Sequence, residues 1–311
     1  MDGLMNVKSF LNQYCPSFFA WLQYKNRIRV IKAHSRMSDD EQLKQVASLY
    51  KEKTGHDLNF GNPRRYTEKI QWRKMFGLDH NMALLSDKYA VREWVSDKLG
   101  PEYLIPLLGA WETVDDIDWD ALPQSFVLKT NNASGTNLIV PDRSKLNLTL
   151  AKKTLCRWMK MRYGWLTFEK QYLDIKPMVI AEKYMKDAKT DELNDYKFLC
   201  FDGAPKFVWV DCDRQVNHRR AVFDLNWQLV EWNQLNYGLP ASLPPKPDCF
   251  DEMKKCAEIL SAGFPHVRVD FYDINGRVYF GEMTFTNGSG YECIYPDEYD
   301  FKLGELWNEP K

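Results

Sequence analysis

The stretch PHVRVDFYDINGRVYFGEMTFTNG, residues 265–288, decides the fold of this chain. Residues 267–272 and 278–285 are rich in β-branched and aromatic side chains, which favour strands. The Asn275-Gly276 pair between them is a typical two-residue hairpin turn. The sequence therefore predicts a β-hairpin here.

Charged and hydroxyl side chains lie on both strands of this hairpin. Arg268 and Asp270 alternate with apolar residues and so point to one face. Asp270, Glu282 and Thr284 would offer hard oxygen ligands, which Mg²⁺ prefers. A two-residue turn would pair Asp270 with Gly281 and turn Glu282 to the other face. A magnesium site therefore requires a bulge, or a three-residue turn, that places Asp270 opposite Glu282. The alternative is an ordinary surface hairpin with an Arg-Asp pair.

Outside the hairpin, hydrophobic periodicity separates a largely helical first third from a later part rich in short strands. Helices are expected at 38–55, 67–76, 86–99, 149–163 and 248–262, and strands at 126–129, 138–140, 179–185, 198–201, 207–210 and 222–225. Helices that are segregated from mostly antiparallel strands indicate an α+β fold.

Composition excludes several classes of protein. The 311 residues carry 42 Lys plus Arg against 43 Asp plus Glu, which gives no overall attraction to a nucleic-acid polymer. The cysteines and histidines lack the close spacing of a zinc site. Reduced cysteines and the absence of a signal peptide or a long apolar run favour a cytoplasmic protein.

The N-terminal segment is basic. No acid occurs between Asp2 and Asp39, whereas bases and aromatic residues alternate there. Residues 16–37 are therefore a candidate for peripheral contact with an anionic membrane, at the inner face of the cytoplasmic membrane. The alternative is a basic helix that packs its aromatic residues on the body of the protein.

Three further segments carry candidate binding residues. In FVLKTNNASG, residues 126–135, a strand ends in Lys129 and a loop of small residues follows, a combination that suits a phosphate group. Glu182 and Lys183 interrupt an apolar strand, so part of it faces water or a polar ligand. Lys197 and Arg214, near strand ends, suit a γ-phosphate or an acidic substrate.

In their order along the chain, these segments resemble the ATP-grasp superfamily, and specifically its branch named after the teichuronopeptide biosynthesis protein TupA. The resemblance runs from about Arg36 to Trp307. Its most specific part joins RVDFY, residues 268–272, to GEMTF, residues 281–285, and SDKYAVR, residues 86–92, supports it.

The resemblance implies an ATP-grasp fold in which two α+β subdomains clasp ATP. The chain would divide into a helical N-terminal region, 1–120, a small subdomain, 121–190, and a large subdomain with the metal-binding hairpin, 191–311. The implied cofactor-binding residues are Lys88 and Lys129 on the phosphates, Asn131, Ser134 and Gly135 in the loop over them, and Glu182, Lys183 and Tyr184 at the adenine.

The implied metal ligands are Asp270, Glu282 and Thr284. The family usually has Asn where Thr284 stands, which puts a second Mg²⁺ in doubt. Arg268 would stabilise the transferred phosphoryl group, with Lys197 and Arg214 as further catalytic cations. The amides of residues 288–290 could receive an oxyanion.

The implied activity is an ATP- and Mg²⁺-dependent carboxylate-amine ligase that forms an amide through an acyl phosphate. It would join an amine or amino acid to a uronic-acid-containing capsule, O-antigen or teichuronic glycan. One alternative is a glycosyltransferase that uses Asp211 and Asp213 as a D-x-D metal site. Others are a sugar kinase of the same fold and a scaffold that no longer turns over ATP.

Overall fold

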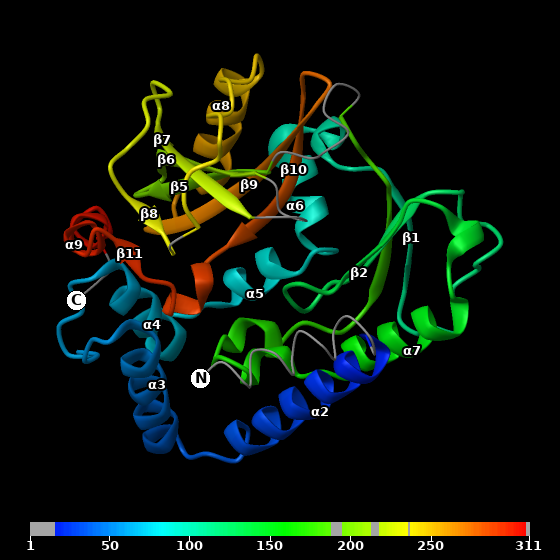
Figure 1. The fold of residues 1–311 in the computed structure, drawn as a ribbon, viewed down its shortest axis with the longest axis horizontal. Helices are drawn as coiled ribbons and strands as arrows, with labels where there is room; N and C mark the ends of the chain where they lie inside the picture. Colours follow the sequence, from blue (N-terminus) through cyan, green and yellow to red (C-terminus); the bar gives the residue numbers. More distant parts are fainter. Residues whose placement is uncertain (1–15, 188–194, 213–217, 236, 309–311) are drawn as a thin grey trace.

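The computed structural model describes residues 16–187, 195–212, 218–235 and 237–308 (Figure 1). Its helices are α2 (Pro16–His34), α3 (Asp39–Thr54), α4 (Tyr66–Phe76), α5 (His80–Ser86), α6 (Val91–Leu99), α7 (Leu148–Met159), α8 (Phe250–Ser261) and α9 (Glu298–Glu305). Among these described residues, no helix is long and apolar enough to cross a bilayer.

Two antiparallel sheets form the centre of the molecule. The four-stranded sheet has the order β1-β4-β2-β3, from β1 (Leu107–Trp111), β2 (Phe126–Thr130), β3 (Asn137–Val140) and β4 (Val179–Lys183). The five-stranded sheet has the order β10-β9-β5-β6-β7, from β5 (Asp195–Phe201), β6 (Ala204–Cys212), β7 (Arg219–Asp224), β9 (His266–Ile274) and β10 (Arg277–Thr284). A short pair joins β8 (Asn233–Gln234) to β11 (Ile294–Tyr295). The α+β prediction is confirmed.

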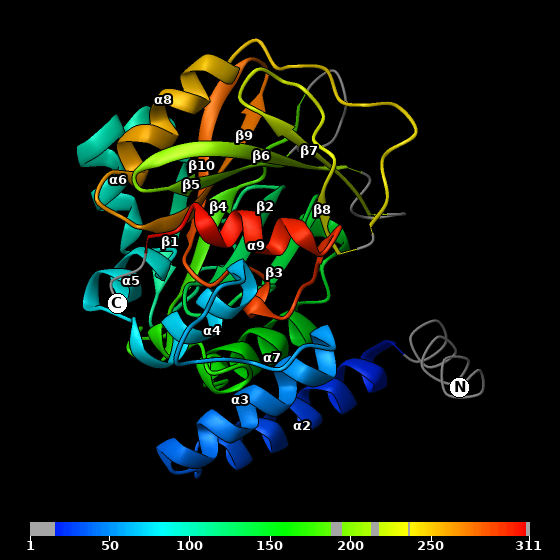
Figure 2. The ribbon, with the colours of Figure 1, turned by 90° about the vertical axis from the view of Figure 1, so that its left-hand side faces the viewer.

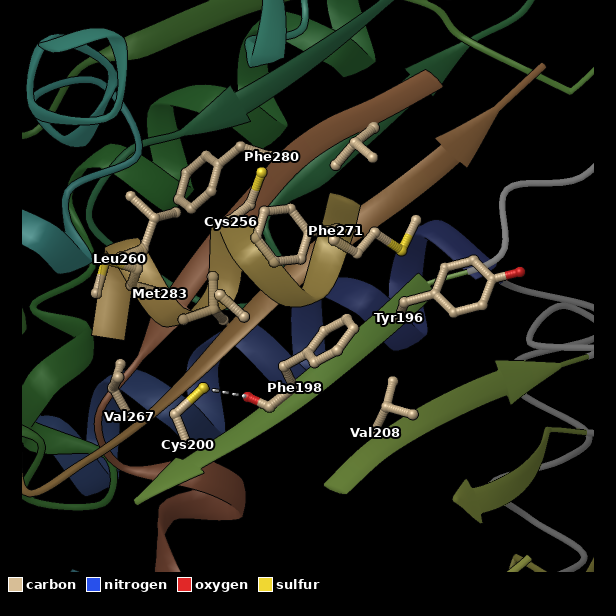
Figure 3. Close-up of a cluster of buried hydrophobic side chains, with 14 of the residues drawn as sticks. Tyr196, Phe198, Cys200, Val208, Cys256, Leu260, Val267, Phe271, Phe280 and Met283 are labelled. Carbon is tan, nitrogen blue, oxygen red and sulfur yellow. Dashed lines mark hydrogen bonds between the residues drawn. The ribbon is translucent and has the colours of Figure 1, made fainter. Parts of the chain in front are cut away.

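The main hydrophobic core lies between α8 and one face of the five-stranded sheet (Figure 3). Phe198 of β5 and Phe271 of β9 are fully buried and contact each other edge to face, with ring centroids 5.8 Å apart. Alternation along each strand turns every second side chain to the opposite face. Part of that second face packs on α4 and α9 through Tyr66, Trp209 and Trp307. The rest of it carries charged side chains.

The predicted helix 86–99 is wrong at its start. Helix α5 ends at Ser86, and α6 begins only at Val91. The Asp87 carboxylate accepts hydrogen bonds from the backbone N–H groups of Tyr89 and Ala90, at 2.8 and 3.2 Å, and so closes a turn between the two helices. This local side-chain bonding competes with a continuous helix. The predicted helix 149–163 also ends earlier, at Met159.

Helix α9, which the sequence patterns did not predict, packs closely on the start of α4. Gly304 allows this approach, because a Cβ atom there would overlap the carbonyl oxygen of Arg64 and lie 3.0 Å from the backbone N of Tyr66. The Lys69 ammonium donates to the Gly304 carbonyl at 2.7 Å. The missing side chain therefore sets how close the two helices lie.

We expect Gly304→Ala to lower the free energy of unfolding by about 1–3 kcal/mol, although Ala favours a helix over Gly by about 1 kcal/mol. Urea unfolding followed by circular dichroism measures the change. Gly61→Ala is the control, because a Cβ there meets only Asn59 Oδ1, at 3.5 Å. A neutral or stabilising Gly304→Ala would contradict the packing described.

Candidate active site

A β-bulge sets the register of the hairpin. Ile274 pairs with Arg277 across the two-residue turn, and Phe271 pairs with Phe280. The register then shifts at Gly281, so that Glu282 lies opposite Asp270. A Cβ on Gly281 would lie 3.1 Å from the Asp270 carbonyl oxygen, so glycine suits the bulge. The arrangement that a magnesium site requires is therefore present.

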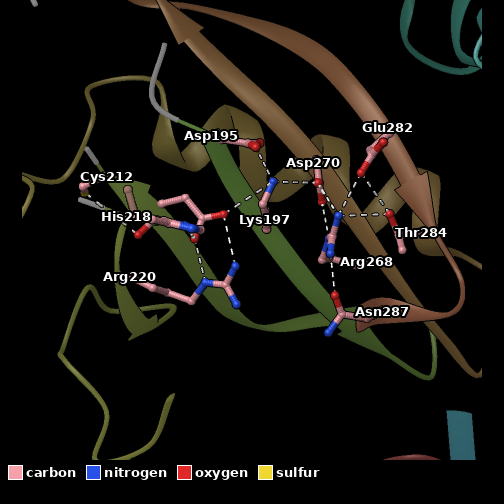
Figure 4. Close-up of polar contacts among 12 residues, drawn as sticks. Asp195, Lys197, Cys212, His218, Arg220, Arg268, Asp270, Glu282, Thr284 and Asn287 are labelled. Carbon is pink, nitrogen blue, oxygen red and sulfur yellow. Dashed lines mark hydrogen bonds and ion pairs between the residues drawn. The ribbon is translucent and has the colours of Figure 1, made fainter. Parts of the chain in front are cut away.

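The bulge aligns charged side chains in one row across the five-stranded sheet (Figure 4). Strand pairing places Lys197 beside Asp270, Asp195 beside Asp211, and Asp211 beside Arg220. All of these side chains lie on the face opposite the α8 core. We call this set the charge row: Glu282, Arg268, Asp270, Lys197, Asp195, Asp211 and Arg220.

Lys197 lies at the centre of the charge row. Its ammonium donates to Asp195 and to Asp270 Oδ2, the latter at 3.0 Å, and lies 3.9 Å from Asp211 Oδ2. Only 7% of the side chain is exposed. Burial works to lower the pKa of Lys197, but Asp195 and Asp270 outweigh it and raise the pKa. The lysine therefore stays charged and holds three acids together.

Arg268 joins the oxygen donors of the hairpin. Its Nη2 lies 2.7 Å from Asp270 Oδ2, 2.9 Å from Glu282 Oε1 and 3.0 Å from Thr284 Oγ1. All three predicted metal ligands therefore face one point, which a nitrogen of Arg268 occupies. Its Nη1 donates to Asn287 Oδ1 at 2.5 Å.

These donors fit a magnesium ion that arrives with a polyphosphate. The described residues contain no group of three His, Cys, Asp or Glu that could hold a metal by itself. Mg²⁺, however, is commonly bound through one or two carboxylates together with substrate phosphates. Glu282 keeps 39% of its side chain exposed, against 2% for Asp270. Burial works to raise the pKa of Glu282, but Lys88, Arg268 and Lys197 lower it to about 2, so this ligand is ionised.

A cavity of about 190 Å³ lies between the two sheets and ends at the charge row. Its lining comprises Lys88, Arg92, Lys129, Ser134, Gly135, Asn137, Glu182, Asp195, Lys197, Asp270, Tyr272, Phe280, Gly281 and Glu282. The structure thus brings together most of the predicted binding residues, from segments far apart in the sequence.

Ion pairs occupy the far end of this cavity. Lys129 donates to Glu182 Oε2 at 2.5 Å, and Arg92 donates to Glu182 Oε1 at 3.2 Å. The Lys88 ammonium donates to the Ala133 carbonyl at 2.7 Å. Burial lowers the pKa of Lys88, while Glu282 opposes that shift. Cations from β2, from the turn before α6 and from α6 thus line the same cavity as acids of the charge row.

Three predicted cofactor-binding residues do not line this cavity. Asn131 donates to both carboxylate oxygens of Asp87 at 3.0 Å and to the Lys176 carbonyl, and so fixes the turn before α6. Lys183 is exposed, and Tyr184 lies beyond the end of β4. Predicted residue Arg214 lies outside the described residues.

Sequence reasoning missed two arginines. Arg92 had a detectable signal, since it closes the SDKYAVR segment, but the resemblance gave it no role. Arg220 had none, because its role depends on the register between β6 and β7, which pairs it with Asp211: its Nε donates to Asp211 Oδ1 at 2.6 Å and its Nη2 to Asp211 Oδ2 at 3.2 Å. His218 Nε2 lies 3.1 Å from the same Asp211 Oδ1. Asp211 thus pairs with the Arg220 guanidinium, and Asp213, the other residue of the D-x-D alternative, lies outside the described residues.

The molecule is thus an α+β protein in which two antiparallel sheets share a cavity lined by both cations and acids. The sequence model of the TupA-like ATPgrasp family matches residues 68–308. This match covers well over half of the chain, which therefore belongs to the TupA-like ATP-grasp family.

No curated protein matches the sequence. Solved structures similar to the chain include the D-alanine-D-alanine ligase from Bacillus anthracis in complex with ATP, with 16% identity and a TM-score of 0.38 over 65% of this chain and 53% of that chain. The L-amino acid ligase from Bacillus licheniformis has 13% identity and a TM-score of 0.44 over 79% of this chain and 56% of that chain. The chain spans little more than half the length of these two ligases, so its activity, substrates and partners remain proposals.

We expect Asp211→Asn to lower the free energy of unfolding by about 3–5 kcal/mol near neutral pH, because it leaves the Arg220 charge buried without its partner. Burial works to raise the pKa of Asp211, but Arg220 outweighs it, so the folded pKa lies well below the usual value.

The stability from Asp211 is therefore fully present above about pH 4, the unfolded pKa, and is lost as the pH falls toward the folded pKa. Urea unfolding at several pH values should show the gap between wild type and variant narrowing below pH 4. Asp251→Asn, at an exposed ion pair with Lys246, is the control. A gap that is constant with pH would contradict the described pairing.

Proposed function

We propose that the protein is an ATP- and Mg²⁺-dependent ligase that joins a carboxylate to an amine. The observation that carries this proposal is the convergence of Asp270, Glu282 and Thr284 on one nitrogen of Arg268, where Asp270 and Glu282 also line the cavity that contains Lys88 and Lys129. Membership of the ATP-grasp family supports ATP as the substrate that fills this cavity.

The proposed roles follow from position. Lys88 and Lys129 would hold phosphates, and Ser134 and Gly135 would close over them, with Glu182 and the neighbouring Lys183 and Tyr184 at the adenine. Asp270, Glu282 and Thr284 would hold Mg²⁺, which offsets the charge of the transferred phosphoryl group. Arg268 and Lys197 would neutralise charge beside it, and Arg214 remains a predicted further cation.

The activated carboxylate needs shielding from the triphosphate, since both are anionic. Arg268 would provide this shielding, because its guanidinium bridges the acids of the hairpin and the side chain of Asn287. The following loop is held from below: Lys74 donates to the Ser289 carbonyl at 2.9 Å, and Gln71 to the Gly290 carbonyl at 2.8 Å. These bonds fix a loop whose amides could receive an oxyanion.

The proposed carboxylate is a uronic acid of a capsule, O-antigen or teichuronic glycan or its precursor. The family description, which refers to TupA, supports this choice. The division of the chain at residues 120 and 190 is likewise a proposal. Strand β1, which lies before residue 120, pairs with β4, which lies after it, so the first two parts share one sheet.

We expect Glu282→Gln to lower Mg²⁺-dependent ADP release by about a hundredfold, because the amide removes one of two anionic metal ligands. A coupled assay of ADP measures the rate. Glu298→Gln, in an exposed pair with Lys302, should leave the rate unchanged. Full activity of Glu282→Gln would exclude this metal site.

The ligase assignment itself is tested by a screen of uronic-acid glycans crossed with amines and amino acids, with mass analysis of the glycan. The proposal requires ADP release that depends on a carboxylate and an amine together. ADP release that needs only a sugar would favour a kinase, and transfer from a UDP- or GDP-sugar would favour a glycosyltransferase. A chain that releases no ADP with any pair would be a scaffold.

A cytoplasmic site at the inner membrane face is also proposed. Helix α2 lies at the outer edge of the molecule (Figures 1 and 2), and Ile31 and His34 bury its inner side. Its described bases are exposed, next to Trp21 and Leu22: Lys25, Arg27, Arg29 and Lys32. A basic surface with apolar residues suits an anionic bilayer.

We expect the double variant Arg27→Glu, Arg29→Glu to bind phosphatidylserine vesicles about tenfold or more weakly. Each base near an anionic surface contributes about 1 kcal/mol to the free energy of binding. Co-sedimentation measures binding. In the control variant, two exposed bases elsewhere on the surface, Lys255 and Arg277, are changed to Glu. An equal loss of vesicle binding in both double variants, or no vesicle binding by the wild type, would contradict membrane contact through α2.

A further inference from the structure

Within the part of the chain that the structure describes, the neighbouring strands β7 and β8 each carry a buried hydrogen-bond donor without a partner. They are Nη1 of Arg220, on β7, and Nε2 of Gln234, on β8. Arg220 is 5% exposed and Gln234 is 1% exposed. Buried donors are nearly always satisfied, because an unmade bond costs free energy. These two donors therefore indicate a place for an acceptor group.

The geometry of Arg220 is fixed. Asp211 accepts from its Nε and Nη2. The guanidinium carbon lies 4.7 Å from the ring centroid of Trp209 and 4.9 Å from that of Tyr237, so aromatic rings limit its rotation. Guanidinium donors act in the plane of the group. Nη1 is therefore the donor that remains, and its direction is set.

A chain of hydrogen bonds orients Gln234 in the same way. Arg268 can only donate, and it donates to Asn287 Oδ1, so the Asn287 amide nitrogen faces Gln234 and donates to its Oε1 at 2.9 Å. The Gln234 nitrogen must then point away from Asn287. Asn233 Nδ2 donates to the Arg220 carbonyl at 2.8 Å and ties β8 to β7.

The acidic residue Glu292 comes just before the segment that pairs with β8, since the Cys293 carbonyl accepts from the Leu235 N–H at 2.8 Å and Ile294 pairs with Gln234. Glu292 makes no hydrogen bond or ion pair with any other residue that the structure describes. Its carboxyl group lies against Gly288, where a Cβ would come within 2.6 Å of Glu292 Cδ. Burial raises the pKa of Glu292, and the positive charges of Arg220 and Arg268 oppose this shift.

We propose that Arg220, Gln234 and Glu292 form the subsite for the incoming amine, and that this amine is an α-amino acid. Arg220 and Gln234 would donate to its carboxylate, and Glu292 would face its ammonium. Two donors and one acid match a zwitterion, whereas a simple carboxylate would meet repulsion from Glu292 and a simple amine would leave both donors unmatched. This inference rests on the proposed ligase function.

The proposed subsite lies at the opposite end of the charge row from the place where the substrate carboxylate would be activated. Arg220 ends the charge row at the side opposite Glu282, with Asp211 and Lys197 between it and Asp270 (Figure 4). The acid that attacks the γ-phosphate must lie at the Asp270 end. A carboxylate held by Arg220 and Gln234 is therefore one that does not react.

These groups account for each proton and electron pair that moves when the amide forms. The ammonium gives one proton to Glu292, and the neutral amine attacks the acyl carbonyl, so that a C–N bond forms. The C–O bond to phosphate breaks, and phosphate leaves with the electron pair. The second proton on nitrogen passes to the departing phosphate, and Glu292 returns its proton to solvent.

Binding is tested by titration calorimetry on the full chain with Mg²⁺ and a nonhydrolysable ATP analogue. The probes are a panel of L- and D-amino acids, and for each that binds, the amine that lacks its carboxylate. We expect at least one amino acid to bind, and its amine to bind about tenfold or more weakly, because a charged acceptor for two donors is missing.

Gln234→Glu keeps the shape and the bond from Asn287 but replaces the donor, so amino-acid affinity should fall by about tenfold or more. Glu292→Gln should weaken binding of the ammonium similarly. Gln124→Glu, on the exposed surface, is the matched control. Thermal melts identify a variant that fails to fold. In that case the affinities of the wild-type chain for each amino acid and for the matching amine test the subsite.

ADP release in the same samples distinguishes the two proposals. ADP release with amines that lack a carboxylate, at rates equal to those with amino acids, would overturn the subsite and keep the ligase. Amino-acid binding that Gln234→Glu and Glu292→Gln both weaken, without ADP release under any pairing, would keep the subsite and overturn the ligase. Unchanged affinity in both variants would overturn the subsite.

Discussion

The structure depends on keeping seven charged side chains in balance on one buried face of a sheet. The charge row brings four acids and three bases together across β10, β9, β5, β6 and β7, and Lys197 lies within 4 Å of three of the acids. Each charge would be expensive to bury alone, so removal of one partner strands its neighbour. The four acids exceed the three bases by one, and Lys88 supplies a further cation from the facing side of the cavity. This near-balance reduces the cost of burying each charge.

The cavity has two ends with different tasks. At the charge row, Arg268 bridges the oxygen donors that we assign to Mg²⁺. At the other end, Lys129 and Arg92 pair with Glu182. Arg268, Lys129 and Arg92 are thus paired with acids of the same site. Under the proposed function, ATP binding exchanges these internal ion pairs for bonds to phosphate and to the metal, which lowers the net gain from each contact.

Much of this could be predicted from the sequence. Residues 265–288 contain the turn, both strands and the metal-ligand candidates, because turn chemistry and strand alternation are local. The sequence also indicated that a bulge or a three-residue turn is needed to bring Asp270 opposite Glu282, and the structure has the bulge. The family resemblance, carried by these same residues, is confirmed by the match over residues 68–308.

Other features depend on contacts between distant segments and left no local pattern. The break between α5 and α6 arises from the Asp87 carboxylate, which Asn131 also binds from 44 positions away. Arg220 became a candidate only through its partner Asp211, and β1 is defined by pairing with β4. The resemblance implies a role for Asn131 over the phosphates, and in the structure its side chain binds Asp87 in the turn before α6. Residue type indicated polarity in each case, but the partner decided the role.

The central claim is that Asp270 and Glu282 hold the metal of a bound nucleotide. A crystal structure with Mn²⁺ and a nonhydrolysable ATP analogue, with the metal located by its anomalous scattering, tests it directly. The account predicts Mn²⁺ between Asp270 and Glu282, in contact with the phosphates, with the Arg268 guanidinium displaced from the point it occupies here. Metal bound elsewhere, or Arg268 still bridging both carboxylates beside a bound nucleotide, would contradict it.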